Sequence, residues 1–520
     1  MRAFVAPILT ILVVDFLHQK LDPAHFREST DSQFGGLPLL LELWNQLDYS
    51  ILLTQCGIFK VRGLATWKLA FAFVASLICH CSSDLKRLEF WNQDALLQTS
   101  LKVSVVTQSV LSRFLNLFSQ WPAFNLARVQ QLQTDPQYAL ADGDVIALDD
   151  TLIPHQYAKK LPFLCKLFDH SLKTYVMGIN LLATHAIKQD GREYPLFYSF
   201  WDKPDPEEAA VTKLDLALQQ LRTMRKLLPP QMRLWVSMDR WFFSKPFCLK
   251  LEAMGFDWVT KAKRNTVFYR KTSSKKGKPR FTRITTREIL CEAYAQMPQT
   301  QDAQPNCLAI PNLYMKTMEP NPEAKGRKTN RALFSPVAGV VVKKLTEDES
   351  EESRRDSTSP DPEAVAQYKD VFLLVSNRQD APDQVVKAYQ KRWRIELLFR
   401  NAKSELGLNE CHSRNENHLN AHVALLFTAE TLVRRLEWEY NATVDPKLRM
   451  THGEVIIQMF RTHCMRSTLH SHHGILDVVR LHFPIRVRRL ASFFKRFWPQ
   501  QITLGWFDPL PDCKCSPSSG

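Results

Sequence analysis

The sequence lacks several patterns that identify common classes of site. It has no Walker phosphate loop and no G-x-G-x-x-G motif, so we expect no nucleotide cofactor. Its eleven cysteines include no C-x-x-C pair and are odd in number, which favours reduced thiols in the cytosol over a disulfide framework. No apolar run reaches the roughly 18–20 residues that a membrane-spanning helix needs. We therefore expect neither a membrane protein nor a nucleotide-dependent one.

An apolar stretch near the start of the chain, Ala3–Val14, partly resembles a secretion signal. Pro7 interrupts it, Asp15 follows it, and no small-x-small cleavage motif comes next. We therefore expect a cytoplasmic protein.

Histidine is frequent toward the C-terminal end, which raises the alternative of a structural zinc site. The spacing of these residues matches no zinc-finger or deaminase pattern, so surface or DNA-facing positions are the better interpretation. The residues are His452, His463, Cys464, His470, His472, His473 and His482.

The sequence does have a large excess of positive charge. Its net charge is +15 and its isoelectric point is about 9.3, which predicts a polyanionic partner. An apolar content of 45% and a charged content of 23% are typical of globular proteins. A chain of 520 residues is long enough for two to four domains.

The segment Pro382–Leu408 predicts one long helix, because no Pro or Gly interrupts about seven turns between Pro382 and Gly407. At roughly 100° per residue, four of its polar side chains fall within a stripe about 60° wide. These are Tyr389, Arg392, Glu396 and Lys403. An ordinary surface helix with an i,i+4 ion pair would give the same stripe, so the stripe alone does not decide its role.

The context of this stripe, YQKRWRIELLFRNAKSELGL over Tyr389–Leu408, resembles the Y-R-E-K signature of bacterial insertion-sequence transposases of the insertion-sequence-four type. Those enzymes are DDE transposases with an RNase H-like catalytic core. The resemblance implies two further aspartates upstream, each at a strand end. It also implies that Tyr389, Arg392 and Lys403 contact DNA at the transposon end, where the family holds a flipped base while a hairpin forms.

Two short apolar segments upstream end in carboxylates, as the resemblance requires. VIALDDT predicts a buried strand that ends at Asp149 and Asp150, and MRLWVSMD predicts a second one that ends at Asp239. Phosphodiester cleavage and transfer use two cations about 3.5–4 Å apart, and Mg²⁺ prefers carboxylate oxygens. We therefore predict that Asp149, Asp239 and Glu396 bind two Mg²⁺ ions, for which Mn²⁺ can substitute.

The first aspartate is ambiguous, because Asp149 and Asp150 point to opposite sides of a strand and only one of them should be a ligand. The family pattern is mostly Asp-x-Thr/Ser, which favours Asp149 through Thr151 and leaves Asp150 as the alternate.

The pattern along the chain predicts an α/β protein: an RNase H-like core interrupted by a mostly β insertion, with all-α terminal regions. The expected parts are a helical N-terminal DNA-binding domain (1–141), the first part of the core (142–263), a β-rich insertion (264–369) with a disordered acidic loop (346–363), the second part of the core (370–408), and a helical, basic C-terminal region (409–520). Val259–Arg287 holds eleven Lys/Arg and no acidic residue, which suits either a solvated loop or phosphate contact.

Together these features predict a bacterial cut-and-paste DNA transposase that is nucleoid-associated and acts as a homodimer on the inverted repeats of its own element. Its partner would be double-stranded DNA, at the transposon ends and at the target. The alternatives are a catalytically silent, transposase-derived repressor, and an RNase H-like nuclease without strand transfer. Intact carboxylates argue against the first, and the Y-R-E-K stripe argues against the second.

Overall fold

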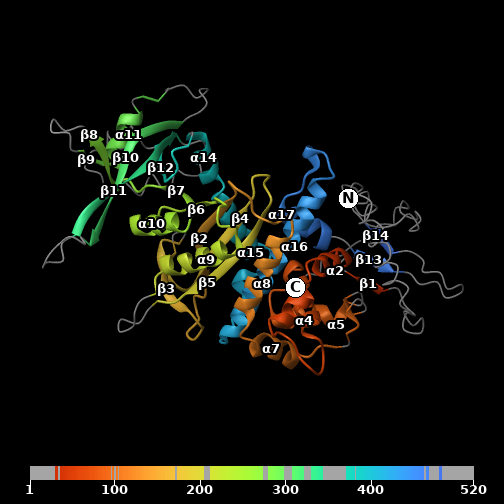
Figure 1. The fold of residues 1–520 in the computed structure, drawn as a ribbon. Helices are drawn as coiled ribbons and strands as arrows, with labels where there is room; N and C mark the ends of the chain where they lie inside the picture. The colour runs from red at the N-terminus through yellow and green to blue at the C-terminus, as the bar shows by residue number, and fades with distance from the viewer. Residues whose placement is uncertain are drawn as a thin grey trace, which may run out of the picture. The chain divides into compact units, whose positions relative to one another are not determined.

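The structure is a computed structural model, and it forms two compact units (Figure 1). One unit is Asn125–Arg400 and the other combines Met1–Phe124 with Asn401–Gly520. The residues described are 30–32, 36–94, 97–98, 101–103, 105–169, 172–203, 211–272, 279–294, 296–297, 307–320, 330–343, 371–380, 382–461, 464–467 and 479–482. The predicted acidic loop 346–363 and most of the basic C-terminal end lie outside these residues.

The unit Asn125–Arg400 is built on an eleven-stranded sheet in the order β3-β4-β2-β6-β7-β12-β11-β10-β8-β9, with β5 paired to β4. The strands that fall within the residues predicted to form the core are β2 (Val145–Pro154), β3 (Leu164–Asp169), β4 (Thr174–Ile187), β5 (Glu193–Trp201), β6 (Trp235–Met238), β7 (Asp257–Lys261) and β12 (Val371–Ser376). The predicted mixed α/β class with a large sheet is confirmed.

The centre of this sheet is parallel, since β6 pairs in parallel with both β2 and β7. All four residues of β6 are buried, as are the first residues of β2, which explains why both segments are continuous apolar runs. Helices α9 (Lys213–Leu227) and α10 (Lys245–Ala253) pack against the strands. A capping box between Thr212 and Asp215 fixes where α9 begins.

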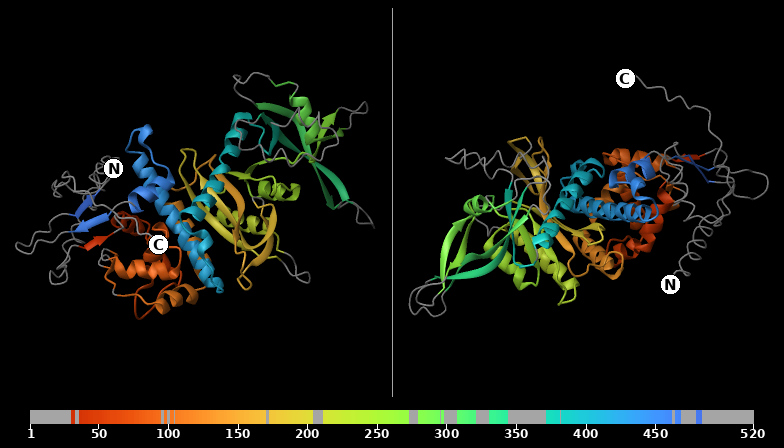
Figure 2. Two further views of the ribbon diagram at one scale, coloured as in Figure 1. Left: turned by 180° about the vertical axis from the view of Figure 1, so that it is seen from behind. Right: turned by 90° about the horizontal axis from the view of Figure 1, so that it is seen from above.

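Four further strands extend the sheet beyond β12: β8 (Val267–Thr272), β9 (Arg280–Thr285), β10 (Cys307–Pro320) and β11 (Asn330–Lys343) (Figure 2). Strands β8 and β9 both lie within the basic segment Val259–Arg287, and they pair antiparallel. Strands β3 and β10 and the helix α11 (Thr286–Tyr294) were not predicted from the sequence. The ring of Phe281 stacks on that of Phe334 at 3.9 Å between centroids, which fastens β9 to β11.

The prediction of one continuous helix over Pro382–Leu408 is wrong. The segment forms α14 (Pro382–Gln390) and α15 (Trp393–Ser404), separated by a turn at Lys391 and Arg392. Backbone hydrogen bonds across the turn are of the tighter i→i−3 kind, including Arg392 N–H to Tyr389 O at 2.9 Å. Gly407, with φ of +68°, lies beyond α15 and begins the short 3₁₀ helix Leu408–Glu410.

The first predicted strand is also longer than expected. β2 continues through Asp149 and Asp150 to Pro154, because it stays paired with the long antiparallel strand β4. Only its pairing with β6 stops at Leu148.

The other unit is mainly helical. Its longest helix, α16, packs against α4 and α7. The helices are α2 (Leu37–Gln46), α3 (Tyr49–Gln55), α4 (Thr66–Ile78), α5 (Asp84–Gln93), α7 (Gln108–Leu117), α16 (Glu416–Asn441), the 3₁₀ helix η4 (Pro446–Leu448), α17 (His452–Ile456) and the π-helix η5 (Ile457–Arg461); α8 (Trp121–Thr134) joins this unit to the other.

Two details of this unit differ from prediction. The C-terminal region was predicted to be helical, but its last described helix ends at Arg461, and Val479 is in a strand. Strand β13 (Cys464–Ser467) pairs with β1 (Thr30–Ser32) and with β14 (Val479–His482), so backbone partners distant in sequence replace the helical hydrogen bonds. In the described part of the chain, no helix is long and apolar enough to cross a membrane.

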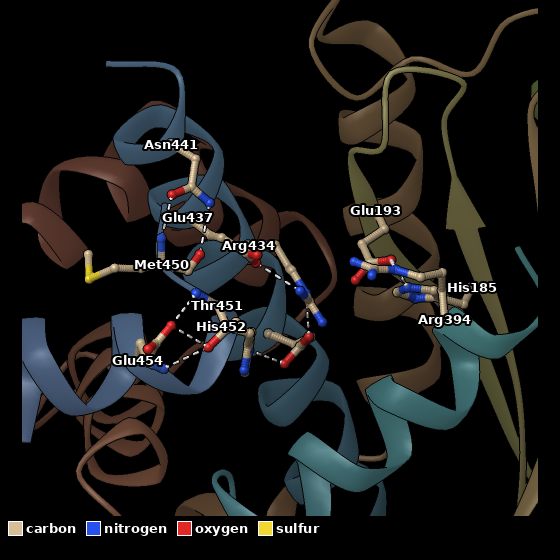
Figure 3. A network of polar contacts seen from close by, with 11 residues as sticks. His185, Glu193, Arg394, Arg434, Glu437, Asn441, Met450, Thr451, His452 and Glu454 are labelled. Carbon is tan, nitrogen blue, oxygen red and sulfur yellow. Dashed lines mark hydrogen bonds and ion pairs between the residues drawn. The ribbon is translucent and has the colours of Figure 1, made fainter. Parts of the chain in front are cut away.

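A buried polar cluster joins α16 to α17 in this unit (Figure 3). Glu430 lies 2.8 Å from His452 Nε2 and 2.9 Å from Arg434 Nε. Both of these ion pairs lie within the helical unit, so we regard the cluster as structural.

Candidate active site

Asp149 and Asp239 occupy equivalent positions on neighbouring parallel strands. The parallel ladder between β2 and β6 ends at the pair Leu148 and Met238, and each aspartate is the next residue along the chain. Adjacent strands lie about 4.8 Å apart, so this register brings the two carboxylates to the same edge of the sheet. The predicted strand-end geometry is therefore correct with respect to β6, although β2 itself continues.

The Asp149 side chain is largely buried, with 17% of its surface exposed. Burial raises the pKa of Asp149 to about 8; Arg392 opposes this rise, whereas Asp150 and Asp239 add to it. Asp149 Oδ1 accepts a hydrogen bond from the Asp150 N–H at 2.8 Å. The carboxyl therefore lies in a place that disfavours negative charge unless a cation is present.

Arg392 lies at the helix break and contacts two of the three predicted catalytic carboxylates. Its Nη1 is 3.3 Å from Asp149 Oδ2 and 2.5 Å from Glu396 Oε1. Burial alone would lower the pKa of Arg392, but the nearby Tyr389, Glu396, Asp149 and Asp239 raise it above its ordinary value. Three acidic side chains from β2, the end of β6 and α15 thus act on one guanidinium.

Asp150 has different partners from Asp149, on the other side of β2. Its Oδ2 accepts hydrogen bonds from Lys213 Nζ at 2.7 Å and from the Asn180 amide at 2.6 Å. The Lys213 ammonium also lies 5.1 Å from the ring centroids of both Trp201 and Trp241. The Asp150 charge is therefore already neutralised by a lysine, whereas Asp149 faces Asp239 and Arg392.

The predicted DNA-contacting residues are placed as follows. Tyr389 is the next-to-last residue of α14, is partly exposed, and its ring centroid lies 5.6 Å from the Arg392 guanidinium carbon. Lys403 is on α15, seven residues after Glu396 and hence on the same face of that helix. Two of the four residues of the predicted stripe, Arg392 and Glu396, are in direct contact.

Sequence reasoning missed three residues that support these groups. Lys213 carries no motif and is found only through its contact with Asp150. Arg394 lies inside the recognised signature segment, but its partner, Glu193, is distant in the sequence. Glu193 is an isolated acidic residue at the start of a strand and belongs to no sequence motif that would mark it as functional.

The donor chemistry at this edge suits a hard divalent cation, because it consists of carboxylates and the burial of Asp149 leaves its charge poorly compensated. In the described residues, however, no three His, Cys, Asp or Glu side chains lie close enough to form a metal-binding group. The Arg392 guanidinium instead bridges Asp149 and Glu396.

Comparison with known proteins gives one match to a protein family. Residues 141–432 match the family described as "Transposase DDE domain". A comparison with curated protein sequences gives no match. Among solved structures, the chain is similar to a piggyBac transposase synaptic complex with hairpin DNA, at 11% identity and a TM-score of 0.40, over 83% of this chain and 81% of that one. At that TM-score the likeness does not establish a shared fold.

The family match spans more than half of the chain. It includes β2, β6, α14 and α15, and with them all of the residues of the candidate active site. Members of this family cleave DNA and transfer its strands. The chain belongs to the DDE transposase family.

Proposed function

We propose that this protein is a cut-and-paste transposase of the insertion-sequence-four type, in which Asp149, Asp239 and Glu396 hold two Mg²⁺ ions. In this proposal it binds the terminal inverted repeats of its own element as a homodimer and acts in the bacterial cytoplasm, associated with the nucleoid. The sheet around β2 and β6 would be the RNase H-like core, β8–β11 the insertion, and the helical unit the N- and C-terminal regions predicted from the sequence.

One observation supports the assignment most strongly: one guanidinium, that of Arg392, pairs with Asp149 and Glu396 and is influenced by Asp239. Carboxylates on three separate elements rarely lie around one cation without a functional reason, because their mutual repulsion opposes folding. The Lys213 ion pair of Asp150 supports Asp149 as the first ligand.

When bound, the cations would activate the attacking oxygen and stabilise the leaving oxygen. Arg392 pairs with Asp149 and Glu396, so its guanidinium neutralises two of the carboxylates that would hold the cations. Its two-pronged geometry also suits it to contact a DNA phosphate. Tyr389 and Lys403 would add a hydroxyl and a point charge along the same DNA end.

The decisive experiment is a strand-cleavage and joining assay with Mg²⁺ on DNA from the ends of the element. Wild type is compared with Asp149→Ala, Asp150→Ala, Asp239→Ala and Glu396→Ala. We expect wild type to release and join ends, and Asp150→Ala to retain a measurable rate. The other three variants should lose at least about 10³-fold in rate, since each removes a ligand of the reacting groups.

The two alternative functions give different results in the same assay. Tight binding of end DNA without cleavage by wild type would favour the transposase-derived repressor. Cleavage without joining would favour the nuclease. Retained cleavage by Asp149→Ala together with loss by Asp150→Ala would reassign the first ligand to Asp150.

A further inference from the structure

An ion pair between a buried glutamate of the β4–β5 hairpin and an arginine of α15 holds the start of the helix that carries Glu396, and 38% of the arginine side chain is exposed. Glu193 is the first residue of β5 and is fully buried. Its Oε2 accepts a hydrogen bond from Arg394 Nε, and it lies 3.7 Å from Nε2 of the buried His185. Figure 3 shows these three side chains together, Arg394 reaching from α15 and the other two lying on the hairpin.

A second cation at the helix break contacts the same hairpin. Lys391 Nζ donates a hydrogen bond to the backbone carbonyl of Lys188 at 3.1 Å, at the end of β4. Lys391 and Arg394 thus flank Arg392 in the sequence and both bind the hairpin, whereas Arg392 itself points to Asp149. Three side chains within four residues therefore fix the turn between α14 and α15.

The hairpin is rigidly joined to the strand that carries Asp149. Strand β4 pairs with β2 along its length, and Ala183 of β4 lies opposite Asp149 while His185 lies opposite Ala147. Glu193 in turn pairs with Ile187 of β4. A short, hydrogen-bonded path therefore runs from the Asp149 strand to the start of α15.

The helix break makes this path necessary. A continuous helix would have had the orientation of α15 set by α14, but the turn at Lys391 and Arg392 removes that constraint. Glu396 lies only two residues after Arg394, within the first turn of α15, so a small rotation at Arg394 moves the Glu396 carboxylate directly.

We propose that Glu193, acting through Arg394, is a positioning residue that sets α15 so that Glu396 and Arg392 face Asp149. The proposal rests on the proposed function for its catalytic consequence, but the physical clamp can be tested separately. Groups that orient metal ligands in other proteins typically change metal affinity or activity by about 10- to 100-fold when removed.

The test compares Glu193→Gln, Arg394→Gln and the double variant with Arg192→Gln. Arg192 is a matched control because it forms an ion pair with Asp190 on the same hairpin, at 2.5 Å, with 31% and 46% of the two side chains exposed. The measurements are amide hydrogen exchange over residues 391–400, binding of end DNA without metal, thermal stability, and the Mg²⁺ concentration that gives half-maximal cleavage.

We expect both single variants to speed exchange over 391–400 and to raise the half-maximal Mg²⁺ concentration by about 10- to 100-fold. The double variant should resemble the singles, because the two residues act as one unit. DNA binding without metal should stay within about twofold, and Arg192→Gln should match wild type in every measurement. If Glu193→Gln does not fold, Arg394→Lys, which keeps a positive charge beside Glu193, replaces it.

The proposal is overturned if exchange over 391–400 is unchanged. It is also overturned if cleavage falls only in proportion to the unfolded fraction, at an unaltered Mg²⁺ dependence. Failure of wild type to cleave end DNA would instead refute the proposed function, and the exchange comparison would still decide whether the clamp exists.

Discussion

At the scale of single residues, the site keeps a carboxyl where the fold disfavours its charge. Asp149 is largely buried between Asp150 and Asp239, and its pKa is raised to about 8. Ionising it therefore costs stability in the metal-free protein, and Arg392 recovers only part of that cost. Such a conflict between stability and charge is typical of residues selected for function.

Asp149→Asn is expected to stabilise the metal-free protein, and more so at higher pH. The folded-state pKa of Asp149 is above the ordinary value of about 3.8, so the wild-type protein loses stability as pH rises from about 4 to about 8. The asparagine variant does not titrate. At about pH 8 the free energy of unfolding of the variant should exceed that of wild type by on the order of a few kcal/mol, which gives it a higher melting temperature. Near pH 4 the two melting temperatures should match.

Thermal unfolding in the presence of a chelator measures this difference, and Mg²⁺ should raise the melting temperature of wild type but not of the variant. A stability difference that does not grow with pH would contradict the assignment of a raised pKa to Asp149.

Lys213→Met is expected to destabilise the protein by about 1–3 kcal/mol, because it removes the counter-ion of a mostly buried carboxylate. The Lys213 and Asp150 side chains are 14% and 20% exposed. Asp150→Asn should cost less in the Lys213→Met background than in wild type, since the two residues interact directly. Urea unfolding of the four proteins measures this coupling, and strictly additive effects would show that the ion pair contributes nothing.

At the scale of elements, the sequence predicted the position of the signature helix but not its break. The 382–408 segment has helical spacing and no Gly or Pro between Pro382 and Gly407, and these local signals do not reveal what Lys391, Arg392 and Arg394 contact. Each of these residues bonds to a group about 200 residues away or more in the chain, namely Lys188, Asp149 and Glu193. Contacts of that separation carry no periodic signal, so the break could not be predicted.

The insertion strands offer a prediction at the same scale. Phe281 of β9 stacks on Phe334 of β11 and contacts Tyr314 of β10 at 5.1 Å between ring centroids. Aromatic pairs of this kind contribute about 0.5–1.5 kcal/mol each beyond burial. We expect Phe281→Ala to speed amide exchange in β8 and β9 while leaving β2 and β6 unchanged.

Thr282→Ala is the matched control for this change, because Thr282 is the exposed neighbour on the opposite face of β9. Equal exchange in the two variants would mean that the aromatic cluster does not hold the hairpin.

At the scale of the whole molecule, the mixed α/β class followed from the sequence, the site residues stay a prediction, and the contacts that support them could not be predicted. Apolar runs ending in Asp149 and Asp239 are visible in the sequence because both strands are buried on both faces. The contact between Asp150 and Lys213, which lies on a helix more than 60 residues away, carries no signal in the sequence. The net charge of +15 fits a DNA partner but does not identify the residues that touch it.

The most direct test of the central claim, that Asp149, Asp239 and Glu396 hold the catalytic cations, is iron-mediated cleavage of the polypeptide. Fe²⁺ substituted for Mg²⁺, with ascorbate and peroxide, cuts the backbone close to where the metal binds. We expect fragments that end near residues 149, 239 and 396, suppressed by excess Mg²⁺ and absent in Asp149→Asn. Cuts confined to other segments, or an unchanged pattern in Asp149→Asn, would contradict the three-carboxylate site.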